Sequence, residues 1–121
     1  MARPDPSYSR LVDELHHGRW DAVAEAGGAV AARLLRDPDH ASLAPVAVLA
    51  AGWARAEQGY LPTAVELIER GLRHLTDPSA MRELGDLDAY YLKLVELYLL
   101  TGQVTAAREQ LVAMDSLDAP P

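Results

Sequence analysis

The 121-residue sequence has no cysteine, phenylalanine or asparagine, and it contains one isoleucine, Ile68, and one lysine, Lys93. The lack of cysteine excludes disulfide bonds and metal sites built from thiolates. No apolar run reaches the roughly 18 residues of a membrane-spanning helix, so we expect no such helix. The first ten residues are polar and lack the apolar stretch of a secretory signal. We therefore expect a cytoplasmic protein.

Phe, Asn, Ile and Lys, which are absent or nearly so, have AT-rich codons, and Arg greatly outnumbers Lys, which indicates GC-rich coding and a bacterial origin. The formal net charge of -7 argues against a nucleic-acid surface, because such surfaces need clustered Lys and Arg. An acidic chain favours neutral or basic partners.

Apolar residues recur at helical spacing along almost the whole chain, and no stretch alternates with a period of two. This pattern predicts an all-α fold. Asp5, Asp77 and Asp86 are expected to cap helix N-termini, and the segment 63–66 reads as a capping box. The predicted helices span about residues 6–17, 20–36, 42–58, 62–75, 86–101 and 104–115, with a short helical turn at 78–84.

One turn motif occurs three times, at Gly18, Gly59 and Gly102, which are 41 and 43 residues apart. Each glycine is followed two residues later by a large apolar residue and five residues later by a compact one. Three copies predict three stacked antiparallel helical hairpins in a single domain, residues 1–121. The expected repeats cover about 6–36, 42–75 and 86–115, with linkers at 37–41 and 76–85 and a frayed tail at 116–121.

Further positions of the pattern agree between the copies. The second copy has Gly52, Gly59, Leu61, Ala64, Ile68 and Gly71, and the third has Leu94, Tyr98, Gly102, Val104, Ala107 and Leu111. This arrangement resembles the tetratricopeptide repeat, and the resemblance implies a right-handed solenoid.

Two departures from that family stand out. The family's period is about 34 residues, whereas the turn glycines of this chain are 41 and 43 residues apart. The longer period leaves HEAT-like hairpins as an alternative. The family's tyrosine position holds Glu14 in the first copy and Arg55 in the second. We expect these two side chains to pair between neighbouring hairpins.

The resemblance also implies a binding groove lined by the first helix of each hairpin. Its groove positions fall on Tyr8, Val12, Leu15, Leu49, Trp53, Glu57, Leu92, Glu96 and Leu99. The charged clamp that some members use for a carboxylate is absent, because this chain has no asparagine and only one lysine. We therefore expect the groove to bind an apolar or amphipathic peptide or helix of a partner protein, neutral to basic in charge. Trp53 is expected to be the main contact residue of the groove.

Motifs for catalysis are missing. The four histidines have no metal-ligand spacing, and the sequence contains no phosphate loop, nucleotide fingerprint or nucleophile elbow. We expect no enzyme activity, metal or cofactor, and predict an adaptor or chaperone-like interaction module. Two alternatives stay open: a regulatory or sensor domain of a bacterial regulator, and a self-assembling structural protein such as a homodimer. The helix at 86–101 is apolar nearly all round, so either its own chain or a partner must cover it.

Overall fold

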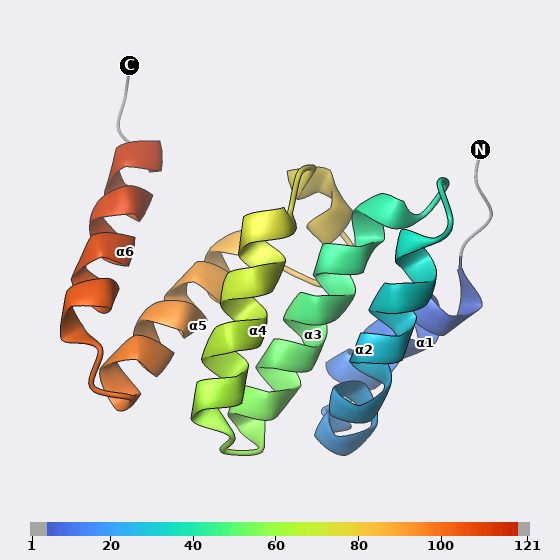
Figure 1. Cartoon of the computed structure of the whole chain (residues 1–121), viewed down its shortest axis with the longest axis horizontal. Helices are drawn as coiled ribbons and strands as arrows, with labels where there is room; N and C mark the ends of the chain where they lie inside the picture. The colour runs from blue at the N-terminus through green and yellow to red at the C-terminus, as the bar shows by residue number, and fades with distance from the viewer. Residues whose placement is uncertain (1–4, 119–121) are drawn as a thin grey trace.

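The fold consists of helices (Figure 1), and the computed structural model describes residues 5–118. This range contains no strand, which confirms the predicted all-α class. The elements in chain order are α1 (Pro6–His16), α2 (Trp20–Leu35), η1 (Ala41–Leu43), α3 (Ala44–Glu57), α4 (Leu61–His74), η2 (Pro78–Met81), α5 (Leu87–Leu100) and α6 (Val104–Asp118). Helix α6 continues past its predicted end near residue 115 to Asp118, and the rest of the predicted tail, 119–121, lies outside the described residues.

The repeated turn has the same backbone geometry in all three copies. Gly18, Gly59 and Gly102 have positive φ angles of 70°, 88° and 78°. In each copy the residue after the glycine donates its backbone N–H to the carbonyl of the residue four positions before the glycine, as in a Schellman motif. The compact residues five positions after each glycine are buried: Val23, Ala64 and Ala107. The sequence motif therefore marks a helix end and a close helix contact.

Most predicted helix starts are confirmed. Asp5, Asp77 and Asp86 each accept a hydrogen bond from a backbone N–H two or three residues further on. The capping box predicted at 63–66 is wrong, because α4 already begins at Leu61 and has no side-chain capping bond.

Helix α3 lies between α2 and α4 (Figure 1), and glycines bring both neighbours close to it. A Cβ atom added at Gly27 of α2 would lie 2.5 Å from the Cβ of Ala51. One added at Gly71 of α4 would lie 2.6 Å from the Cγ of Leu49. Both distances are too short for real carbon atoms, so these contacts require glycine.

Residues 75–86, which we call the strap, connect α4 to α5 and fold back onto the chain. Met81 and Leu84 of the strap are only 2% and 4% exposed. His16 Nε2 of α1 lies 2.7 Å from the carbonyl oxygen of Glu83. The strap is therefore part of the core, although most of it lacks regular structure.

The N-terminus of α1 is fastened to the end of α2 by an acidic cluster. Asp5 is buried, accepts the N–H of Tyr8 at 3.0 Å and pairs with Arg33. Asp37 Oδ2 lies 2.6 Å from His40 Nδ1 beside this pair. The hydrogen bond from Arg33 holds the pKa of the Asp5 carboxyl below its ordinary range, although burial opposes the shift.

We predict that Asp5→Asn lowers the free energy of unfolding near neutral pH by about 1–3 kcal/mol, since a charge-assisted bond and a cap are weakened. Because the pKa of Asp5 is lower in the folded than in the unfolded chain, its carboxylate stabilises the fold at a pH above the unfolded-state pKa. This stabilisation is lost as the pH falls through the folded-state pKa. The difference between wild type and Asp5→Asn should therefore shrink in acid. Urea denaturation followed by circular dichroism at neutral and acidic pH measures it. The exposed Asp39→Asn serves as the control, and a difference that stays constant with pH would contradict the assignment.

Candidate functional site

The predicted groove is closed at its N-terminal end. Tyr8, Val12, Leu15 and Leu49 are all buried in the core of the chain itself. Burial and the nearby Glu83 of the strap raise the pKa of Tyr8 to about 12. Among the described residues, the Tyr8 hydroxyl has no hydrogen-bond partner. The structure thus places these four residues where a partner cannot reach them, because the strap and the neighbouring helices cover them.

The remaining predicted groove residues lie on α3 and α5. Lys93 Nζ lies 3.7 Å from a carboxylate oxygen of both Glu57 and Glu96. The same ammonium lies 4.7 Å from the ring centre of Trp53. Trp53 also contacts Tyr90, with their ring centres 4.9 Å apart, so the expected anchor is already partly covered.

Leu92 and Leu99 of α5 are each 54% exposed, while five other α5 residues, Tyr90, Leu94, Val95, Leu97 and Tyr98, are buried. The chain's own core thus covers one side of this apolar helix and leaves the other open. Lys93 was not among the predicted groove residues, because nothing local in the sequence indicates that it lies beside Glu57 and Trp53.

The expected pair of Glu14 and Arg55 does not form. Glu14 pairs instead with Arg10 one turn earlier, at 3.2 Å. Arg55 donates to Gln58 at 3.0 Å and lies over the ring of Tyr60. Both side chains find partners within their own turn, so equivalent positions in two repeats are not in contact here.

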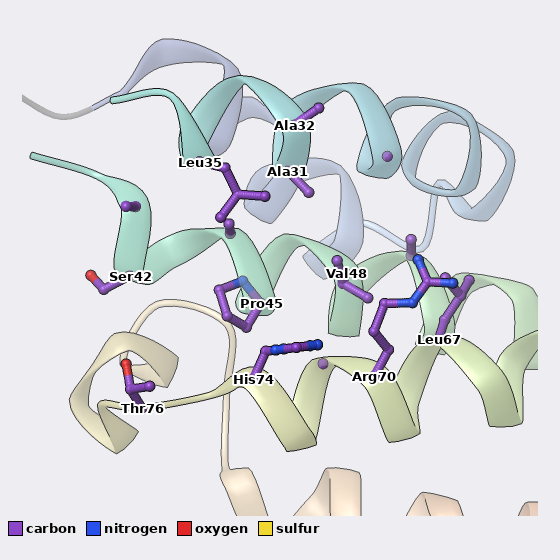
Figure 2. A pocket seen from close by; sticks show the side chains of 15 residues that line it. Ala31, Ala32, Leu35, Ser42, Pro45, Val48, Leu67, Arg70, His74 and Thr76 are labelled. Carbon is purple, nitrogen blue, oxygen red and sulfur yellow. The ribbon is translucent and has the colours of Figure 1, made fainter. Parts of the chain in front are cut away.

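A hollow of about 730 Å³ lies between α2 and α4, with α3 as its floor (Figure 2). Pro45, Val48 and Ala51 belong to this floor. By helical spacing they lie on nearly the opposite face of α3 from Trp53, so the hollow is separate from the predicted groove.

The residues that line each wall of the hollow recur mostly every three or four positions, so they lie on one face of their helix. On α2 the lining residues are Gly28, Ala31, Ala32 and Leu35, and on α4 they are Leu67, Arg70, Gly71 and His74. Small residues make the space, since a Cβ atom added at Gly28 would meet nothing within 4 Å. In the sequence, two adjacent glycines, Gly27 and Gly28, stand inside the helix that forms this wall. Gly27 packs against α3 and Gly28 faces the hollow.

The chemistry of the hollow is mostly apolar. Leu35 stands at its rim and is 66% exposed. Its polar side chains are Arg70 and His74 from α4, with Ser42 and Thr76 at one end (Figure 2). A concave apolar surface of this volume with few polar groups is typical of a binding site.

One cluster has metal-ligand residue types. The ligand atoms of Asp5, Asp37 and His40 lie within 4.8 Å of one another. The guanidinium of Arg33 already pairs with Asp5, so a metal ion would have to displace an internal ion pair. The cluster acts as a cap and salt-bridge network in this fold.

A comparison of the chain with protein-family models, curated proteins and solved structures found no match. None of the helices in the described part of the chain is long and apolar enough to cross a membrane. Fold and site together define an all-α protein with an apolar hollow between three consecutive helices.

Proposed function

We propose that this chain is a non-catalytic protein-interaction module that holds an apolar segment of a partner protein in the hollow. The observation that carries the proposal is an accessible apolar concavity whose lining is rich in Gly and Ala. Small residues let another backbone approach closely. No carboxylate belongs to the lining among the side chains that the structure describes, so the hollow holds no pair of carboxylates for acid–base chemistry.

The three Schellman turns support a divergent tetratricopeptide-like array, with the departure that the strap fills part of the groove such arrays use. To open that groove, Met81 and Leu84 would have to leave the core, at about 1.5–3 kcal/mol for each side chain. Binding in the hollow has no such cost. This difference favours the hollow over the groove as the partner site.

Gly28→Leu tests the proposal because it fills the hollow from an open position on α2. Ala29→Leu is the matched control, since Ala29 is exposed beside Gly28 and does not line the hollow. Peptides selected by the wild type from a displayed library of helical peptides are expected to bind Ala29→Leu equally. We expect them to bind Gly28→Leu at least about tenfold more weakly. Selected peptides that bind all three proteins alike, or a selection that enriches none, would refute the proposal.

Self-association is a second candidate, favoured by exposed apolar side chains at the α5–α6 end. Leu100, Val104, Leu111 and Val112 are 46–60% exposed. Clustered exposed apolar residues usually mark an interface. The mass of the protein in solution distinguishes a dimer from a monomer that awaits a partner.

A further inference from the structure

The two walls of the hollow differ in charge. Ala31, Ala32 and Leu35 make the α2 wall entirely apolar, whereas the α4 wall carries Arg70 and His74 (Figure 2). One side of the apolar hollow therefore carries the guanidinium of Arg70 and the imidazole of His74, although the chain as a whole has a net charge of -7. A ligand that matches both walls is apolar on one side and acidic on the other.

Arg70 is available for such a ligand. Its present partner is Glu66 one turn earlier, at 3.1 Å, and the two side chains are 47% and 71% exposed. Exposed pairs at this helical spacing contribute only a few tenths of a kcal/mol, so exchange of Glu66 for another carboxylate costs little.

The length of the hollow matches two turns of a helix. The wall residues on α2 and α4 each cover seven residue steps, from 28 to 35 and from 67 to 74, which is about 10 Å of helix. Two turns of a guest helix would span that length. The chain shows the same contact internally, where α2 rests on α3 through Gly27 and Ala51.

We propose, building on the function proposed above, that the occupant is an amphipathic helix of another protein whose apolar stripe is bordered by Asp or Glu. Its apolar residues, spaced i, i+3 or i+4 and i+7, pack on the α2 wall and the α3 floor. Its carboxylates accept hydrogen bonds from Arg70 and His74. The proposed partner is therefore acidic, in accord with the local charge of the hollow, and not neutral to basic as the net charge of the chain led us to expect.

Two synthetic helical peptides test this inference. Both carry the same leucine stripe, one with Glu and the other with Lys at the flanking positions, and circular dichroism verifies equal helicity. We expect the acidic peptide to bind the wild type at least about tenfold more tightly than the basic one by fluorescence anisotropy. Arg70→Glu should abolish or reverse this preference. Arg73→Glu, an exposed change on α4 outside the hollow, should retain it and thereby controls for net charge.

The other outcomes separate this inference from the proposed function. If both peptides bind equally and Gly28→Leu weakens both, the hollow binds apolar helices and the acidic specificity is wrong. If neither peptide binds while library peptides do, the acidic amphipathic helix is again the wrong occupant. If the free protein is a dimer that Gly28→Leu converts to a monomer, the occupant is a second copy of the chain. Binding that Gly28→Leu does not weaken places the peptide outside the hollow and overturns the inference.

Discussion

Leu84→Ala is expected to lower the free energy of unfolding by about 2–5 kcal/mol, as a large-to-small change in a packed core does. Leu84 belongs to the strap, outside any helix, yet only 4% of its surface is exposed. It belongs to the buried core cluster and lines the same small hollow as Leu15 of α1, Trp53 of α3 and Tyr90 of α5. Truncation removes a buried core side chain from the place where the strap packs on the helical core.

Urea denaturation followed by circular dichroism measures the effect. Leu92→Ala is the matched control, because the same side chain is truncated at a position that is 54% exposed. We expect the control to change stability by less than about 1 kcal/mol. Equal losses in the two variants would show that the strap is not packed as described.

The neighbouring substitutions Gly27→Ala and Gly28→Ala are expected to change stability in opposite directions. At Gly27 the new Cβ would lie 2.5 Å from the Cβ of Ala51, and the forced separation of α2 and α3 costs about 1–3 kcal/mol. At Gly28 the Cβ meets nothing, so only the helix propensity of Ala counts, which stabilises by about 0.5–1 kcal/mol.

The two glycines control for each other, since both lie inside α2 and gain the same propensity. Thermal and urea denaturation of the two variants against the wild type give the comparison. If both variants are more stable than the wild type, α2 and α3 do not approach each other as closely as the structure shows.

The helices and their turns could be predicted because their determinants are local. Gly18 and Val23 lie five residues apart, and a glycine with positive φ followed by a compact residue specifies a helix end and a close contact without distant information. Asp5 and Asp86 act on backbone groups within three residues of themselves. Such short-range rules can be read directly from a sequence.

The site could not be predicted in the same way, because it depends on where a linker lies. Residues 76–85 have no periodicity that indicates which surface Met81 and Leu84 cover. In the structure they cover part of the groove that the resemblance to a repeat family assigns to a partner. Gly27 and Gly28 are neighbours in the sequence, but only the position of α3 shows that the first packs against a helix and the second faces the hollow. Glu14 illustrates the same limit, since Arg10 on its own helix was the nearer partner.

The strap also has a consequence for the order in which the chain becomes compact. Helical arrays are rich in short-range contacts, which favour rapid folding, but His16 meets the carbonyl of Glu83 across 67 residues. During synthesis from the N-terminus, α1 to α4 can pair before residues 81–84 exist. Until then the inner face around Tyr8 and Leu15 stays uncovered on the nascent chain. Completion of the first half of this protein therefore waits for a segment encoded in its second half.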